Sequence, residues 1–354
     1  DLKLAEEYPH LVRDDDLAKV WFKYDHRFKQ PKISLTFRIE TPKVYRSPKN
    51  LELAKLYEAM MQEGLNELVY PIQMAGLSYG LSIQKKGVLL SIGGYSERIG
   101  DLIKLVTKNL KEVNVDEQKF ANIKEAMARG LKNKKLGQAY SRGGYYNWLM
   151  LLEDQYTEEE KLSALTAITL KDVKAFAKTL YDRVFITGMV HGNWSNKKAQ
   201  ESVDILLSAL GSKSLPENER FEQVVKIIPE GKRFRFSQEV EDNNNSLAYA
   251  IQVGEKDFSL LAQASIIASI VESDFYTQMR TNQQLGYIVW SFNQRIEDRI
   301  FFRLVIQSST HGPFEMSKRV NAWLASTEKL FSKLTDQEFS RHQQSLIVAL
   351  EKEG

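Results

Sequence analysis

The sequence contains no cysteine, so disulfide bonds and zinc sites built from thiolates are excluded. It has no strong excess of charge, because 49 basic residues face 46 acidic ones and the formal net charge is +3. No cluster of lysine and arginine is interleaved with aromatic residues, so a nucleic-acid partner is not expected. No apolar run approaches the ~20 residues that a membrane-spanning helix needs, so we expect no membrane span.

Paired histidines are also missing. The sequence has no HExxH or HxxEH motif, and its five histidines stand apart: His10, His26, His191, His311 and His342. Zinc held by one chain normally needs at least three nitrogen, oxygen or sulfur ligands. We therefore expect no zinc bound by this chain. GxSxG and the glycine-rich phosphate loops are absent too, so nothing indicates a serine nucleophile or a nucleotide site.

The order of predicted elements occurs twice, which indicates an internal duplication. The first copy reads as a strand, a long helix, two strands and two helices, at 33–40, 49–73, 77–83, 88–93, 97–112 and 116–131. The second copy repeats that order at 246–253, 258–280, 286–292, 300–307, 313–332 and from Thr335 onward. An offset of 208 places Leu77 on Leu285 and Tyr79 on Tyr287. After a longer hairpin, an offset of 219 places Phe120 on Phe339.

The pattern predicts an α+β fold, in which helices pack on one face of a largely antiparallel sheet in each copy. With 354 residues, two domains are expected. The first would span 1–212, with 1–16 as an entry segment and 17–212 as its core. A linker would follow at 213–233, and the second domain at 234–354 would be incomplete, because the first copy continues with elements up to 211 that the second lacks.

Two local expectations follow from residue patterns. In the second copy, Ile288, Trp290 and Phe292 alternate along one strand, and we expect this apolar set to face the helices. Val289 and Ser291 would then point toward an open sheet face. The acidic run 14–16 is expected to begin a helix, because aspartate is a preferred N-cap residue.

One group of residues has chemical character: Arg280, at the end of a predicted helix, and Tyr287, at the start of a strand. Gly286 lets the chain turn directly from the one into the other. A guanidinium and a phenol are both hydrogen-bond donors, and together they can stabilise an oxyanion or hold a peptide carbonyl. The first copy has Ile72 where the second has Arg280, so the fold does not require the pair. The residues alone favour a structural role, with Arg280 capping the helix and Tyr287 packing at the sheet edge.

The segment 279–289 reads MRTNQQLGYIV, and it resembles the R-T-x-x-Q-L-G-Y-I-V signature of the pitrilysin family of inverzincins, which are zinc peptidases of the insulin-degrading-enzyme type. Shorter matches occur along the chain at 20–25 (VWFKYD), 65–67 (LNE), 75–79 (AGLSY), 191–193 (HGN) and 306–308 (IQS). The resemblance covers nearly all of 17–354 and points to the C-terminal half of that family.

The resemblance implies a four-domain clamshell of repeated α+β units, in which the first two carry the HxxEH zinc chemistry. This chain would be the third unit and an incomplete fourth. It also implies that Arg280 and Tyr287 reach the zinc site of the other half and stabilise the peptide carbonyl as water attacks. Where the catalytic unit has HxxEH, this chain has LYEAM at 56–60, and Glu58 has no histidine partner. No metal ligand can therefore be carried over.

We accordingly expect the non-catalytic C-terminal half of a zinc endopeptidase, inactive alone, which closes the substrate chamber and supplies Arg280 and Tyr287. Its expected partners are the N-terminal catalytic half and peptide substrates, and zinc is expected in the full-length enzyme. One alternative is an inactive scaffold related to processing-peptidase core proteins. Another is a peptide-binding module that captures extended chains at its sheet edges. The retention of Arg280 and Tyr287 favours the enzyme. The resemblance suggests a periplasmic location, with the cytoplasm as the alternative.

Overall fold

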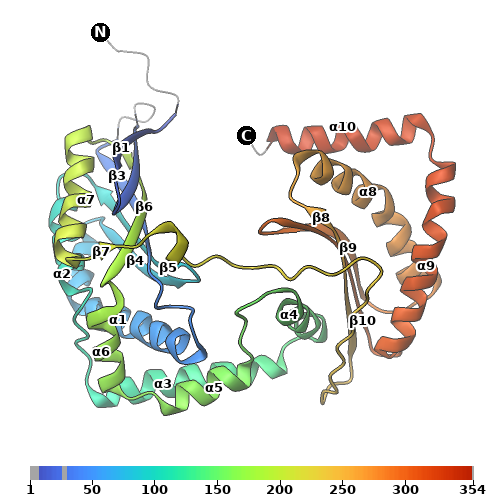
Figure 1. The fold of residues 1–354 in the computed structure, drawn as a ribbon, viewed down its shortest axis with the longest axis horizontal. Coiled ribbons are helices and arrows are strands. Elements are labelled where there is room, and N and C mark those ends of the chain that lie inside the picture. The colour runs from blue at the N-terminus through green and yellow to red at the C-terminus, as the bar shows by residue number, and fades with distance from the viewer. Residues whose placement is uncertain (1–7, 26–29, 353–354) are drawn as a thin grey trace, which may run out of the picture. The chain divides into compact units, whose positions relative to one another are not determined.

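The structure, a computed structural model, describes residues 8–25 and 30–352 and divides into two compact units. Unit 1 comprises 1–134 and 156–222, and unit 2 comprises 135–155 and 223–354. The described elements are helices combined with sheets, which confirms the predicted α+β class (Figure 1).

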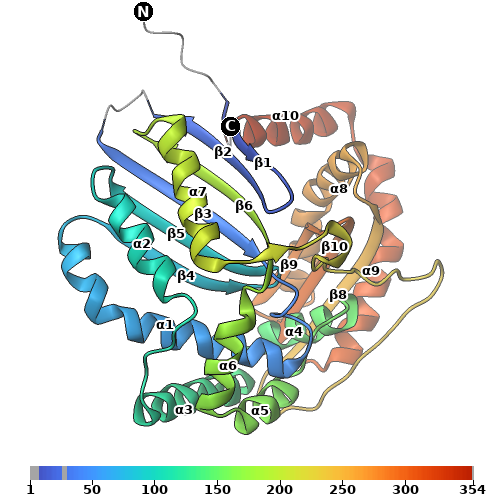
Figure 2. The same cartoon turned by 60° about the vertical axis from the view of Figure 1, so that its left-hand side comes forward.

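Unit 1 is built on a seven-stranded sheet with the strand order β1-β2-β6-β3-β5-β4, and β7 pairs with β6. Its strands are β1 (His10–Asp14), β2 (Ala18–Tyr24), β3 (Lys32–Glu40), β4 (Ser78–Gln84), β5 (Gly87–Tyr95), β6 (Arg183–Gly192) and β7 (Lys213–Ser214). Its α-helices are α1 (Pro48–Met74), α2 (Ile99–Asn109), α3 (Glu117–Asn133), α5 (Glu158–Ala167), α6 (Leu170–Leu180) and α7 (Asn196–Leu210). Short 3₁₀ turns occupy η1 (Lys134–Leu136), where the chain passes into unit 2, and η2 (Glu217–Glu219). Figure 2 shows α2 and α7 lying along one face of the sheet.

The long helix α1 forms because its apolar residues recur at helical spacing and its start is well capped. Ser47 accepts a hydrogen bond from the Asn50 N–H, and Pro48 occupies the first turn, where its missing N–H costs nothing. The apolar side chains that this spacing places on one face are fully or almost fully buried in the unit 1 core: Leu53, Leu56, Tyr57, Met60 and Met61. The prediction of a core-facing helix at 49–73 is confirmed.

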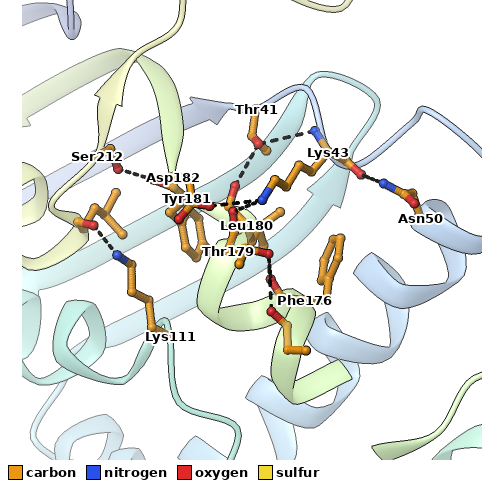
Figure 3. A network of polar contacts seen from close by, with 12 residues as sticks. Thr41, Lys43, Asn50, Lys111, Phe176, Thr179, Leu180, Tyr181, Asp182 and Ser212 are labelled. Atoms are coloured by element: carbon orange, nitrogen blue, oxygen red, sulfur yellow. Dashed lines mark hydrogen bonds and ion pairs between the residues drawn. The ribbon is translucent and has the colours of Figure 1, made fainter. Parts of the chain in front are cut away.

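Side chains from other elements satisfy the carbonyl groups at the end of α6, which have no partner within the helix (Figure 3). The Thr41 hydroxyl donates to the Leu180 carbonyl over 2.8 Å, and Lys43 Nζ donates to the Thr179 carbonyl over 2.6 Å. Ser212 donates to the carbonyl of the residue after α6. These contacts fix α6 against the sheet and against the segment that follows α7.

Unit 2 has a three-stranded antiparallel sheet with the order β8-β10-β9. Its strands are β8 (Asn245–Glu255), β9 (Ile288–Ile296) and β10 (Arg299–Ser308), and its helices are α4 (Ala139–Leu151), α8 (Phe258–Tyr276), α9 (Pro313–Lys333) and α10 (Asp336–Lys352). A π-helical turn, η3 (Thr277–Asn282), continues α8. Leu304 and Ile306 of β10 pack with α8 and α9 in one core, whereas Phe301 packs with the end of α4 in another. Because neighbouring strand residues point to opposite faces, both faces of this sheet are covered.

The predicted orientation of β9 is wrong. Val289 is only 2% exposed and lies in the core with α8, whereas Trp290 is 45% exposed and stacks edge-on against Tyr140 of α4. The register pairs Val289 with Ile306, so it is Val289 that shares the helix-facing side of the sheet. The large aromatic residue Trp290 lies on the face of the sheet that α4 covers. The sequence had suggested that this face would be open.

The acidic run at 14–16 does not begin a helix, which corrects the second local expectation. It forms the turn of the hairpin between β1 and β2, where one Asp15 carboxylate oxygen accepts hydrogen bonds from the N–H groups of Leu17 and Ala18. Aspartate suits this position for the same reason that it suits an N-cap, since its side chain bonds to nearby backbone N–H groups. An aspartate side chain does bond to backbone N–H groups here, as an N-cap would, but it does so in a hairpin turn.

The division into units differs from the boundaries expected from the sequence in two respects. Residues 135–155 belong to unit 2, because α4 packs on β8 and its first turn is held there. The Ser246 hydroxyl donates to the Ala139 carbonyl over 2.7 Å, and the side-chain oxygen of Gln307 accepts from the Tyr140 N–H over 2.9 Å. Within the expected linker, 213–222 stays with unit 1 and 223–233 with unit 2.

One helical stretch among the described residues, Phe258–Asn282, is long and apolar enough to cross a membrane by length and composition alone. This finding differs from the expectation that no apolar run approaches the length of a membrane span. The observation is weak evidence, because the core helix of a globular protein passes the same test. Here the stretch contributes Val271, Phe275 and Met279 to the core of unit 2.

Candidate functional site

The end of α8 sets the position of both predicted site residues. The helix continues into the π-helical turn η3, and its last hydrogen bonds run from the Gln283 N–H to the Gln278 carbonyl and from the Leu285 N–H to the Met279 carbonyl. Gln284 adopts the left-handed conformation, with φ of 51°, which ends the helix. The buried side chains of Met279 and Leu285 then anchor the turn on the core of unit 2. The chain therefore leaves the helix at a fixed point and enters β9 directly.

Gly286 lies where no side chain can be accommodated. A Cβ atom built there would lie 1.8 Å from the carbonyl oxygen of Gln307 in β10, far inside any contact that real Cβ atoms make. The backbone of Gly286 thus packs directly on the neighbouring strand. This close approach brings the next residue, Tyr287, to the start of β9 with its side chain 80% exposed.

Arg280 and Tyr287 are in direct contact, as the sequence suggested they could be. Nη1 of Arg280 donates to the backbone carbonyl of Tyr287 over 2.5 Å. The guanidinium carbon also lies 4.5 Å from the centre of the Tyr287 ring, which is within the range of a cation–π contact. The arginine therefore holds the tyrosine by its backbone and its ring at once.

The Tyr276 ring is a part of this arrangement that sequence reasoning missed. The guanidinium carbon of Arg280 lies 5.2 Å from the centre of that ring, so the arginine lies between two tyrosines. Tyr276 is four residues before Arg280, and the i,i+4 spacing on a helix was a signal that could have identified it.

The site leaves several donors available. A guanidinium has five N–H donors, of which one is directed to the Tyr287 carbonyl. In the part of the chain that the structure describes, no carboxylate forms an ion pair with Arg280 and no group bonds to the Tyr287 hydroxyl. A cation at a helix C-terminus is favourable in itself. The arrangement can therefore serve as a structural clamp and still donate to an oxyanion or a carbonyl.

The sequence offset of 208 pairs different residues with this site in unit 1. It places Ile72 of α1 on Arg280 and Tyr79, in β4, on Tyr287. In the segment 56–60, where the resemblance places HxxEH, Leu56, Tyr57 and Met60 are fully buried in the core. Its one acid, Glu58, accepts a hydrogen bond from the Ile83 N–H of β4 over 3.1 Å. Glu58 therefore has a structural contact in this unit.

Burial raises the pKa of Glu58 above its usual range, and this leads to a prediction about stability. A raised pKa in the folded state means that the folded protein binds the proton more tightly than the unfolded chain does. The stability contributed by Glu58 is thus complete below its unfolded pKa and is lost as pH rises through the folded pKa. We expect Glu58→Gln to raise the melting temperature near pH 7, by less than about 3 °C. The difference should vanish below pH ~4, where wild-type Glu58 is also neutral. A melting-temperature difference that is the same at every pH would contradict this cause.

The histidines do not form a metal centre within the described residues, where no group of three or more histidine, aspartate or glutamate side chains could hold an ion. His26 lies outside those residues. His191 is exposed at the end of β6. The Nδ1 atom of His342 lies 2.8 Å from the Ser269 hydroxyl, and this contact links α10 to α8.

Comparisons with known proteins give a consistent result. A family model described as the middle or third domain of peptidase M16 matches residues 2–164, and one described as the C-terminal lobe domain 4 of a PqqF-like PQQ synthase matches 266–354. The chain is 32% identical over 351 residues to the insulin-degrading enzyme of Homo sapiens, covering 98% of this chain and 34% of that protein. It is 26% identical over 343 residues to a putative zinc protease of Schizosaccharomyces pombe, covering 96% of this chain and 35% of that protein. The chain thus spans about a third of the length of the curated relatives it matches.

Solved structures agree on the fold. The crystal structure of pitrilysin matches with a TM-score of 0.87 at 21% identity, covering 98% of this chain and 37% of that one. An inactive domain of an M16 peptidase from Pseudomonas fluorescens matches with a TM-score of 0.62 at 15% identity, covering 96% of this chain and 83% of that one.

Proposed function

Because this chain belongs to the M16 peptidase family, we propose that it works as the non-catalytic C-terminal half of a zinc endopeptidase. In this proposal, zinc is held by an N-terminal half of the same enzyme, where it activates the water that attacks the peptide. The present half encloses the peptide substrate and brings Arg280 and Tyr287 to the scissile carbonyl.

The contact between Arg280 and Tyr287 is the observation that carries this proposal. The arginine orders the start of β9 while most of its donors stay unused, and the tyrosine hydroxyl is exposed. Donors held in place before the reaction stabilise developing negative charge without a cost of reorganisation. By the sequence offset, unit 1 has Ile72 where unit 2 has Arg280, so the shared order of elements does not by itself require an arginine there.

The alternative function is an inactive scaffold or peptide-binding subunit. Such a subunit would have the same fold and could also bind a peptide, but it would need no pair of donors beside the scissile bond. Reconstitution of activity separates the two functions. The periplasmic location expected from the resemblance is a separate proposal, with the cytoplasm as its alternative.

We expect the 354-residue chain alone to leave a quenched fluorescent peptide uncut, and a mixture with the corresponding N-terminal half to cleave it. Turnover should rise with the concentration of this chain and saturate when the two halves are equimolar. The N-terminal half alone, assayed at the same zinc concentration, is the control. Equal turnover with and without this chain would sink the proposal and favour the scaffold.

A further inference from the structure

The outer edge of β4 in unit 1 presents backbone groups that β5 does not bond. β4 is the last strand of its sheet, and it pairs with β5 alone (Figure 2). A tight turn joins the two strands, with Gln84 opposite Gly87. Because residues alternate in an antiparallel pair, Gln84, Ser82 and Gly80 bond toward β5. The N–H and C=O groups of Tyr79, Leu81 and Ile83 therefore point outward.

Two of these outward groups are capped by side chains from α1. Gln62 Nε2 donates to the Leu81 carbonyl over 3.2 Å, and the Glu58 carboxylate accepts from the Ile83 N–H over 3.1 Å. The caps stand where a further strand would bond, and they protect that end of the edge. Gln62 is exposed and its bond is long, so it is the weaker of the two caps.

At the other end of the edge, none of the side chains that the structure describes caps the strand. Within the described residues, the N–H and C=O of Tyr79 and the N–H of Leu81 have no hydrogen-bond partner. A cavity of about 340 Å³ lies there, lined by Gln62 and Gln73 of α1, by 79–82 of β4, and by Leu89 and Ser91 of β5. The cavity thus lies beside the part of the strand whose backbone is unpaired.

An exposed apolar side chain lies one turn of helix from this opening. Tyr70 of α1 is 62% exposed and lies three residues before Gln73, on the same face of the helix. Strand addition derives its affinity from main-chain hydrogen bonds and its preferences from pockets for alternate side chains. The unpaired edge supplies the main-chain hydrogen bonds. The cavity and the apolar side chain beside it supply space and contact for the side chains of a peptide.

We propose that the Tyr79–Leu81 edge of β4 binds an extended peptide as an added strand. The peptide bonds to the Tyr79 and Leu81 backbone, and one of its N–H groups replaces Gln62 at the Leu81 carbonyl. The Glu58 cap at Ile83 sets the limit of the added strand. The proposal rests on the proposed function only for the choice of a peptide as ligand, and the site does not involve Arg280 or Tyr287.

Fluorescence anisotropy of a labelled, uncharged nonapeptide of alternating valine and threonine measures this binding directly on the 354-residue chain. Tyr79→Pro removes the outward N–H without removing a bond to β5, whereas Tyr79→Val removes the same ring and keeps the N–H. We expect Tyr79→Pro to weaken binding at least about tenfold relative to Tyr79→Val, the scale of one or two lost hydrogen bonds. Gln62→Ala should strengthen binding, because the peptide no longer displaces a cap.

A second probe keeps the test decisive if Tyr79→Pro fails to fold. The same nonapeptide, N-methylated at alternate residues on the face that bonds to the edge, should bind at least about tenfold more weakly than the parent peptide. Equal binding of the two peptides, or of the two Tyr79 variants, would overturn the proposal, as would self-association of the chain in place of peptide binding. The anisotropy is measured without the N-terminal half, whereas the proposed catalytic role is tested by turnover of the reconstituted enzyme, so a failure of the catalytic role and a failure of this site give different results.

Discussion

In the reconstituted enzyme, we expect Arg280→Ala and Tyr287→Phe each to lower kcat by about 10²-fold, the usual scale for losing one oxyanion donor. Tyr287→Phe keeps the ring against which the Arg280 guanidinium stacks and removes only the hydroxyl. Arg280→Ala removes both the donors and the bond to the Tyr287 carbonyl. The two variants therefore test donation by the tyrosine separately from the ordering of β9 by the arginine. Turnover of the quenched peptide by a fixed amount of reconstituted enzyme is the measurement.

Two further variants, and the separate effects on kcat and KM, test whether Arg280 acts as a donor in catalysis. Arg280→Lys keeps the charge and loses the planar fork, so it should retain only part of the activity. Arg295→Ala removes an exposed arginine from the far end of the same strand and should change nothing. An interaction made mainly in the transition state lowers kcat more than it raises KM. If both Arg280→Ala and Tyr287→Phe cleaved the peptide within twofold of the wild-type rate, the catalytic role of the pair would be wrong.

The second large effect is expected from Gly286→Ala. The added Cβ would meet the Gln307 carbonyl oxygen at 1.8 Å, and because that oxygen belongs to the backbone of β10, no side chain can move aside. The start of β9 would have to separate from β10, which carries Tyr287 away from Arg280. Overpacking of this kind costs about 1–3 kcal/mol or more. We expect a lower melting temperature, measured by circular dichroism, together with a loss of turnover at least as large as that of Tyr287→Phe.

Gly144→Ala is the matched control for this variant. Gly144 lies in α4 of the same unit, and a Cβ built there meets no heavy atom within 4 Å. Alanine is favoured over glycine inside a helix by about 1 kcal/mol, so this variant should be at least as stable as the wild type and equally active. A Gly286→Ala protein with wild-type melting temperature and turnover would show that the close approach of β9 to β10 is not needed.

Much of the fold was predictable from local patterns. The predicted elements of both copies occur in the predicted order, and most bounds agree within about two residues. The spacing of apolar residues along α1 and the capping residues of α10, Thr335 and Glu338, are local signals, and the structure follows them. The candidate pair was also identifiable, because Arg280 and Tyr287 are close in sequence and joined by one turn.

Other features depended on partners distant in sequence. Trp290 faces away from the α8 side because Tyr140 of α4, 150 residues earlier in the sequence, covers it. The alternation along β9 could not reveal which face α8 would occupy, since a strand covered on both sides is apolar on both sides. The run at 14–16 was assigned to a helix because an aspartate side chain caps a turn and a helix by the same hydrogen bonds.

Local patterns were enough to predict the α+β elements, their repeated order, and an arginine and a tyrosine joined by a turn with glycine. Long-range packing places Arg280 against the ring and carbonyl of Tyr287, and it requires glycine at 286 because Gln307 is adjacent. It also brings Glu58 and Gln62 to cap part of the β4 edge. The reason is physical. Periodicity and capping act within a few residues of one another, whereas these contacts join groups that become neighbours only when the strands pair and the helices pack on them.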